Sequence, residues 1–168
     1  KRLYFLARDA YPMYLVARKL TEKLNVPVEI RYLRVSRYSL RIPEYHLLGE
    51  QCLDRIFLSG IDVSLYQILK RAGLKKEEIS RISEELHCNG ILRKNLNPRQ
   101  ITELKQYVRK CCREHKTDLL DTIYVRSKAA YNSTIGYLRR EGLLDPVRYG
   151  VVDSGWVGTI QQSLRNIL

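Results

Sequence analysis

The turn from Asp153 to Thr159, Asp-Ser-Gly-Trp-Val-Gly-Thr, is the strongest candidate for chemistry in the sequence. Two of its residues supply hydroxyl groups, and two are glycines, which allow a ligand to approach the backbone closely. A helix that begins at the end of this turn would direct backbone N–H groups at an anion. We therefore predict a phosphate site here, formed by Ser154, Gly155, Gly158 and Thr159. If the φ angle of Gly158 is negative, alanine there should block the ligand with little loss of fold.

Asp153 and Trp156 complete the predicted site in this turn. Asp153 directly follows an apolar strand and would serve as a catalytic carboxylate or accept a hydrogen bond from a sugar hydroxyl. Trp156 would stack on a base or sugar, although a place in the hydrophobic core is an equally open alternative. The whole turn also has a purely structural alternative, in which Ser154 or Thr159 caps the next helix.

Polar residues also follow two predicted strands near the start of the chain. Arg8 and Asp9 come after the first strand, and Ser36 and Arg37 come after the second. Arginine suits a phosphate or carboxylate ligand, because its planar guanidinium binds two oxygens at once. Asp9 would be a nucleophile, a general base or a ribose ligand, or alternatively a cap of the next helix. Because ligands of open α/β sheets bind at the carboxyl ends of the strands, we expect all four residues and Asp153 to share one edge.

The apolar patterns predict the sheet that would position these residues. Residues 1–42 show the pattern strand, helix, strand, and their first strand is a continuous apolar run, as in a buried parallel strand. Residues 135–168 show the pattern helix, strand, turn, helix. Strands joined by helices over such short distances indicate a parallel sheet. The predicted fold class is therefore α/β, with a Rossmann-like, three-layer arrangement around a parallel sheet.

The intervening residues, 43–134, are predicted to form a mostly helical insertion. Apolar residues recur there at helical spacing, Gly73 ends one helix and Pro98 begins another. We therefore divide the chain into an α/β ligand-binding domain, residues 1–42 with 135–168, and the helical insertion. The chain begins in a strand and stops in a helical pattern, so we expect a fragment of a larger protein, with flanking domains of the same polypeptide as partners.

The composition narrows the possible classes of protein. The 168 residues include 30 Lys and Arg and 18 Asp and Glu, for a net charge of +12. The excess is greatest in residues 1–42, where ten basic residues face three acidic ones, which favours an anionic ligand. No apolar run approaches the roughly 20 residues of a membrane span. Four cysteines are too few for a disulfide framework, so we expect a reducing, cytoplasmic environment.

Two other functional interpretations are weaker. Residues 64–85 imitate a helix-turn-helix motif, but the second helix carries four acidic against three basic residues, which disfavours contact with phosphates. Cys111, Cys112 and His115 suggest zinc, but adjacent cysteines ligate one metal poorly, and no Cys-x-x-Cys pair is present. We therefore expect no metal site, and rank nucleic acid last among the partners.

Three segments resemble one protein family. They are Leu3–Tyr11, Tyr32–Arg37 and Val151–Gln161, and together they are similar to the downstream portion of bacterial hydrolases of the haloacid dehalogenase superfamily. Those proteins are often fused to, or encoded beside, glycosyltransferases of surface polysaccharide synthesis. In that family an Asp nucleophile is followed two residues later by a second acid, whereas here Asp9 is followed by Tyr11. The resemblance implies that the hydrolase signature lies upstream of this region.

A second resemblance concerns architecture. The order of the strands, with a Gly- and Thr-containing turn after Val151-Val152-Asp153, looks like a type I phosphoribosyltransferase, in which such a turn holds a 5-phosphate. We therefore expect a small phosphorylated ligand, a sugar phosphate or nucleotide-sugar. A phosphoribosyltransferase-like enzyme and a non-catalytic interaction domain are the alternatives. The sequence does not decide whether the protein is an enzyme; a hydrolase and a phosphoribosyl or glycosyl transferase are both open. It does not identify a cofactor either, and Mg²⁺ is the one cofactor that we consider.

Overall fold

The protein consists of two compact units. The computed structural model describes residues 1–61, 63–155 and 158–168. Residues 1–41 and 131–168 form one unit, called here the sheet unit, and residues 42–130 form the other, called the helical unit. The sequence analysis places the corresponding boundaries after residues 42 and 134. Both boundaries fall inside helices, because α2 (Arg37–Leu48) and α7 (Leu119–Arg140) each contribute residues to both units.

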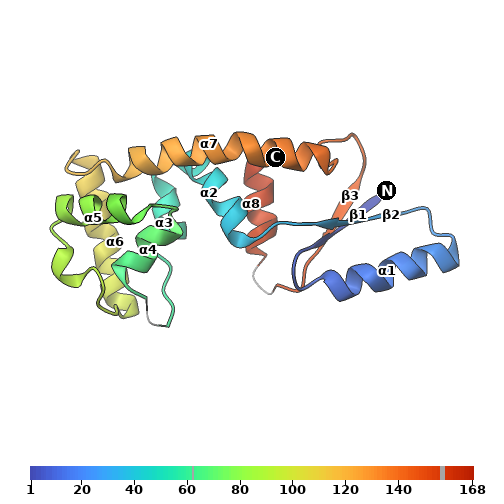
Figure 1. The fold of residues 1–168 in the computed structure, drawn as a ribbon, viewed down its shortest axis with the longest axis horizontal. Coiled ribbons are helices and arrows are strands. Elements are labelled where there is room, and N and C mark those ends of the chain that lie inside the picture. Colours follow the sequence, from blue (N-terminus) through green and yellow to red (C-terminus); the bar gives the residue numbers. More distant parts are fainter. Residues whose placement is uncertain (62, 156–157) are drawn as a thin grey trace. The chain divides into compact units, whose positions relative to one another are not determined.

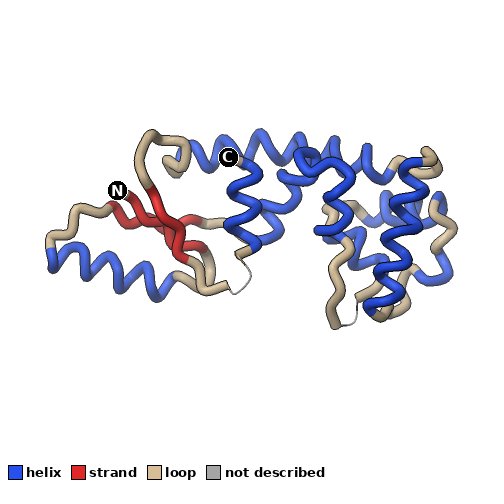
Figure 2. Tube along the Cα trace, turned by 180° about the vertical axis from the view of Figure 1, so that it is seen from behind, coloured by secondary structure: helices blue, strands red, loops and turns tan. Residues whose placement is uncertain are grey.

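The sheet unit is built on parallel strands. Among its described residues these are β1 (Arg2–Leu6), β2 (Glu29–Leu33) and β3 (Tyr149–Val152), in the spatial order β2-β1-β3 (Figures 1 and 2). Leu6 lies opposite Leu33 in β2, and Phe5 lies opposite Val152 in β3. The strands therefore all end at the same edge of the sheet. The predicted α/β class with a parallel sheet is confirmed.

Helices cover both faces of this sheet. α1 (Tyr11–Leu24) connects β1 to β2 and packs against one face, where the ring of Tyr14 meets that of Phe5 at 6.2 Å. The opposite face carries the core of the unit. There the buried side chains of Tyr4 and Leu6 cluster with Leu138 of α7 and Leu164 of α8 (Thr159–Ile167). The alternation of side chains along β1 thus divides its apolar residues between two layers of helices.

The helical unit has a continuous core of its own. The unit comprises the remainder of α2 and α7, and between them η1 (Gly49–Gln51), α3 (Cys52–Ile56), α4 (Leu65–Arg71), α5 (Lys76–Glu85), η2 (Asn89–Ile91) and α6 (Pro98–Arg113). Ser64 and Asn97 each form a capping box, and so define the first turns of α4 and α6. Gly73, with φ of 85°, ends α4.

α7 is longer than the sequence pattern indicates. The pattern of residues 135–168 begins with a helix of its own, but α7 runs without interruption from Leu119 to Arg140. No proline lies between these residues, and a Cβ at Gly136 would meet no described atom within 4 Å, so nothing there ends the helix. Residue 43, where the predicted insertion begins, likewise lies inside a helix, α2.

Candidate functional site

Three loops of the sheet unit meet at the carboxyl edge of the strands. Asp9 lies between β1 and α1, Ser36 and Arg37 connect β2 to α2, and Asp153 directly follows β3. Because the strands are adjacent and parallel, these loops lie side by side. The expectation that the polar residues share an edge is confirmed. That they bind a ligand stays a prediction.

The first loop presents two exposed charged side chains. Arg8 and Asp9 are both exposed, whereas Ala10 is buried and forms the N-cap of α1 without a side-chain hydrogen bond. The alternative in which Asp9 caps this helix is therefore wrong. No hydrogen bond or ion pair joins the Asp9 carboxylate to another described residue. The Asp9 carboxylate is accordingly accessible from solvent and has no hydrogen-bonding partner within the described part of the chain.

In the second loop the two predicted ligand residues, Ser36 and Arg37, have different structural roles. The hydroxyl of Ser36 accepts a hydrogen bond from the backbone N–H of Ser39 at 3.1 Å, and the hydroxyl of Ser39 accepts one from the N–H of Ser36 at 2.8 Å. This reciprocal pair caps α2. Ser36 thus positions the helix, while Arg37 begins it and is exposed to solvent.

The third loop holds Asp153 in a defined orientation. Its Oδ2 accepts a hydrogen bond from Nε2 of Gln161, in α8, at 3.1 Å. A Cβ built on Gly155 would lie 2.8 Å from the same oxygen, so the carboxylate rests directly over the Gly155 backbone. Gln161 was missed by the sequence analysis. Its place in the first turn of the predicted helix, eight residues after Asp153, was the only signal.

The turn before α8 begins differently from either capping prediction. Gly158 is the N-cap, with φ of 62°, and no side chain supplies a capping hydrogen bond. The structural alternative, in which Ser154 or Thr159 caps α8, is therefore wrong, and the condition of a negative φ at Gly158 is not met. Ser154 is exposed and Thr159 is half-buried. Trp156 lies outside the described residues.

The N-termini of the helices at this edge favour negative charge. α1, α2 and α8 all begin there, and the first turns of these described helices contain no Asp or Glu. The positive ends of the helix dipoles are consequently not neutralised by side chains of their own first turns. Arg8 and Arg37 add two full positive charges. The edge therefore combines exposed guanidinium groups and the positive ends of helix dipoles with two carboxylates, Asp9 and Asp153.

The opposite end of the sheet, where the strands begin, contains a structural network. The buried Arg2 donates to the carbonyl of Gly142 at 2.6 Å and to Glu29 at 2.6 Å. Arg31 and the hydroxyl of Tyr4 donate to the carbonyl of Glu141, and so satisfy the carboxyl end of α7. The hydrogen bond from Arg2 lowers the pKa of Glu29, and burial raises the pKa of Tyr4. Part of the basic excess in residues 1–42 is thus structural.

The described residues offer a poor fit to a magnesium ion. Asp9 and Asp153 supply two carboxylates from separate loops, and no group of three His, Cys, Asp or Glu residues in the described ranges is arranged to hold a metal. We derive no step through a metal at this edge. In the helical unit burial raises the pKa of Cys52 to about 12 and that of Cys112 to about 11, as expected for structural thiols.

The helix-turn-helix segment is engaged within the helical unit. α4 and α5 form as the pattern predicts, but Arg81 of α5 is ion-paired with Glu85 at 2.6 Å and with Asp118 at 2.7 Å. One of the three basic groups of α5 that would meet DNA is therefore already neutralised. The pairing adds to the acidic excess of α5 as a reason against nucleic-acid binding.

Comparisons with known proteins add no assignment. Protein-family models, curated proteins and solved structures contain no match to this chain. In the part of the chain that the structure describes, no helix has the length and apolar character needed to cross a membrane.

Proposed function

We propose that the sheet unit is a Rossmann-like domain that binds a small phosphorylated molecule, a sugar phosphate or nucleotide-sugar, at the carboxyl edge of its strands. One observation carries the proposal. The parallel alignment of the strands brings three loops and the N-termini of α1, α2 and α8 to the edge where Arg8 and Arg37 are exposed. Helix N-termini and arginine are the groups that proteins use to bind phosphate.

The third loop suggests how the rest of the ligand is held. Asp153 would accept a hydrogen bond from a sugar hydroxyl, in the orientation that Gln161 imposes. The exposed Asp9 would contact the ligand from the first loop. We propose binding here and no covalent step.

Calorimetry with inorganic phosphate tests the anion site. We expect Arg8→Gln and Arg37→Gln each to weaken phosphate binding about tenfold to a hundredfold, because a hydrogen bond to a charged group contributes about 1.5–3 kcal/mol. Arg148→Gln is the matched control, since Arg148 is equally exposed but precedes β3, at the other end of the strands. Equal weakening in all three variants would indicate a diffuse charge effect and would contradict the proposed site.

Glucose 1-phosphate tests the role of the third loop. Asp153→Asn and Gln161→Leu should weaken binding of the sugar phosphate but leave binding of inorganic phosphate unchanged, because only the sugar has hydroxyls to lose. If both probes lose affinity together, Asp153 and Gln161 maintain the loop and do not recognise the ligand.

A further inference from the structure

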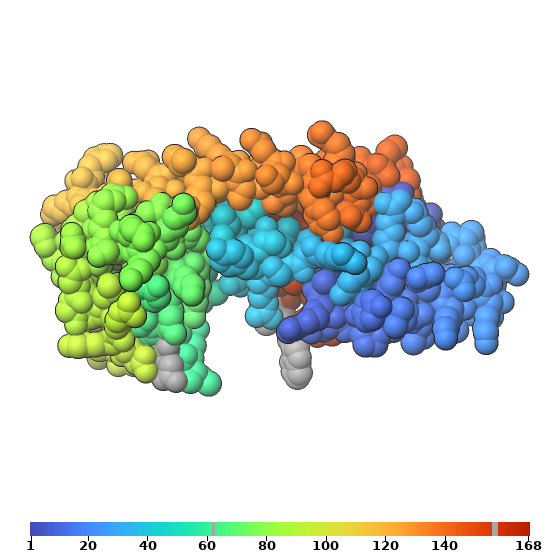
Figure 3. Space-filling view, viewed as in Figure 1, coloured from blue at the N-terminus to red at the C-terminus, as the bar shows by residue number. Residues whose placement is uncertain are grey.

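A groove of about 680 Å³ runs along the outer edge of β2, within the sheet unit. α1 forms one wall with Tyr14 and Arg18, and the last turns of α7 form the other with Tyr137. β2 and the residue that follows it form the floor, with Ile30, Tyr32 and Arg34. In Figure 1 the strand lies between these two helices, and in Figure 3 the α1 side chains lie directly beside those of the β2 segment.

The backbone of β2 faces this groove with unpaired groups. The N–H of Glu29 donates to the carbonyl of Lys1, and the carbonyl of Leu33 accepts from the N–H of Ala7. The odd-numbered residues of β2 therefore bond inward to β1, and the N–H and C=O groups of Ile30 and Tyr32 point outward. No described residue pairs with these outward groups. Edge strands with unpaired groups are templates for another extended chain.

The outward edge already binds one protein group at its end. The N–H of Arg34, which has the same outward parity as Ile30 and Tyr32, donates to the hydroxyl of Tyr137 at 2.9 Å. This contact shows that the edge accepts a hydrogen-bonding partner from the groove side. Because the N–H of Arg34 is already used, the unpaired stretch lies within β2, about 16 Å long for five residues.

The two sides of the groove differ in chemistry. On the α1 side the rings of Tyr11, Tyr14 and Tyr32 pack together, with centroids 5.2 to 6.1 Å apart, and form an aromatic surface. On the α7 side lies Arg31, whose side chain projects to the opposite face of the sheet from that of Tyr32. An added strand would therefore alternate apolar residues, facing the tyrosines, with polar residues on the other face of the sheet.

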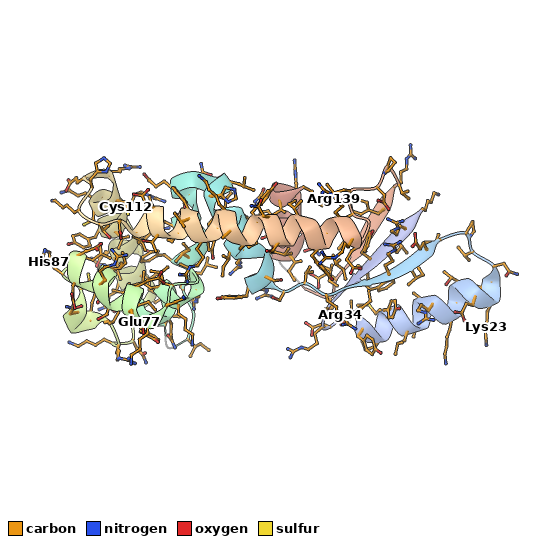
Figure 4. All side chains as sticks on the ribbon, turned by 45° about the horizontal axis from the view of Figure 1, so that its top comes forward. Lys23, Arg34, Glu77, His87, Cys112 and Arg139 are labelled. Atoms are coloured by element: carbon orange, nitrogen blue, oxygen red, sulfur yellow. The ribbon has the colours of Figure 1, made fainter. Side chains whose placement is uncertain are left out.

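The charges of the groove select the polar residues of such a strand. Arg18, Arg31 and Arg34 line the groove against one acid, Glu141. Arg31 is held by Glu29, and Arg18 lies over the ring of Tyr14 and is paired with Glu22 at 3.9 Å. The side chain of Arg34, labelled in Figure 4, is exposed. It forms no hydrogen bond or ion pair with a described residue. Its free positive charge favours acidic residues.

We propose that this groove binds an extended peptide in which acidic residues alternate with apolar ones, added to the sheet as a further strand beside β2. Main-chain hydrogen bonds to Ile30 and Tyr32 would provide affinity, and the alternation would provide specificity. The partner is thus an acidic segment of another polypeptide. The groove lies along the side of the sheet, so peptide binding is independent of the phosphate site proposed above.

The test uses a fluorescein-labelled seven-residue peptide of alternating Glu and Val, with binding followed by fluorescence anisotropy. The same peptide N-methylated at alternate residues keeps its charge but cannot form the ladder of hydrogen bonds. We expect N-methylation to weaken binding at least tenfold. Equal binding of the two peptides would mean that charge alone is recognised, and no binding at about 100 µM protein would exclude even a weak interface. Either result would overturn the proposal.

Two protein variants locate the peptide on β2. Arg34→Glu should abolish binding of the Glu-Val peptide, whereas Arg148→Glu, which makes the same change outside the groove, should not. Ile30→Pro removes one outward N–H that the sheet does not use, so binding should fall while the circular dichroism spectrum is retained. Arg8→Gln, which lies in the phosphate site, should leave peptide binding unchanged. If Arg34→Glu binds the peptide as tightly as the wild type, the groove is not the site.

Discussion

Replacing Gly158 with alanine should destabilise the sheet unit through backbone conformation alone. Gly158 immediately precedes α8 with φ of 62° and ψ of 23°, in the left-handed region. A Cβ there would meet one described atom within 4 Å, Oε1 of Gln161 at 3.7 Å, so no steric clash adds to the cost. The left-handed conformation costs an L-residue about 1–2 kcal/mol. We expect a loss of that size in the free energy of unfolding for Gly158→Ala, and a smaller loss for Gly158→Asn, because Asn tolerates this conformation.

Gly136→Ala in α7 is the matched control, because it makes the same chemical change inside a helix. A Cβ at Gly136 would meet no described atom within 4 Å, and alanine is favoured over glycine there by about 0.5–1 kcal/mol. Urea titrations followed by circular dichroism should therefore give opposite signs for the two substitutions. A Gly158→Ala protein as stable as the wild type would refute the argument from φ. The strain also means that lost ligand binding in this variant could not by itself locate the ligand.

Three further outcomes follow from the described contacts. The hydrogen bond from Lys105 lowers the pKa of Asp54. Asp54 should therefore stabilise the helical unit above its unfolded pKa and lose this contribution as the pH falls through its folded pKa. Acid titrations followed by circular dichroism should show a smaller loss for Lys105→Gln. Cys52, with its pKa raised to about 12, should react with iodoacetamide at pH 8 only after unfolding in urea, as mass spectrometry would show. Tyr4→Phe removes the 2.7 Å hydrogen bond to the carbonyl of Glu141 and should cost about 1–2 kcal/mol in urea titrations, whereas Tyr38→Phe at an exposed position should cost nothing.

The sequence was most informative where apolar periodicity and position along a strand determine structure. A continuous apolar run predicted β1, and the short distance between two strands predicted parallel pairing. Parallel pairing then placed Asp9 and Asp153 at one edge, although they are far apart in the chain. Such inferences succeed because the direction of every strand in a parallel sheet follows from the connecting helices.

Side-chain partnerships and helix ends were harder to predict, because they depend on contacts between distant residues. Nothing in the local pattern showed that Gln161 would donate to Asp153, or that Arg2 would be buried against the carbonyl of Gly142. The cap of α8 was not predicted either: hydroxyl residues are common caps, and Ser154 and Thr159 were considered as alternatives, but Gly158 occupies that position. A polar residue after a strand can cap a helix, bond to a distant side chain or face solvent, and its tertiary contacts determine which of these occurs.

The order of the strands along the chain has a consequence for folding. Arg2 pairs with Glu29 across 27 residues, but with Tyr149 across 147 residues, the difference between positions 2 and 149. Closing the longer loop costs about 1.5 kcal/mol more in chain entropy, unless residues 42–130 fold first and shorten it. We expect β1, α1 and β2 to acquire protection from amide exchange early, and β3 to acquire it last. Since Asp153 arrives only with β3, a nascent chain that ends before residue 149 would already carry Arg8 and Arg37 but would lack the third loop of the proposed site.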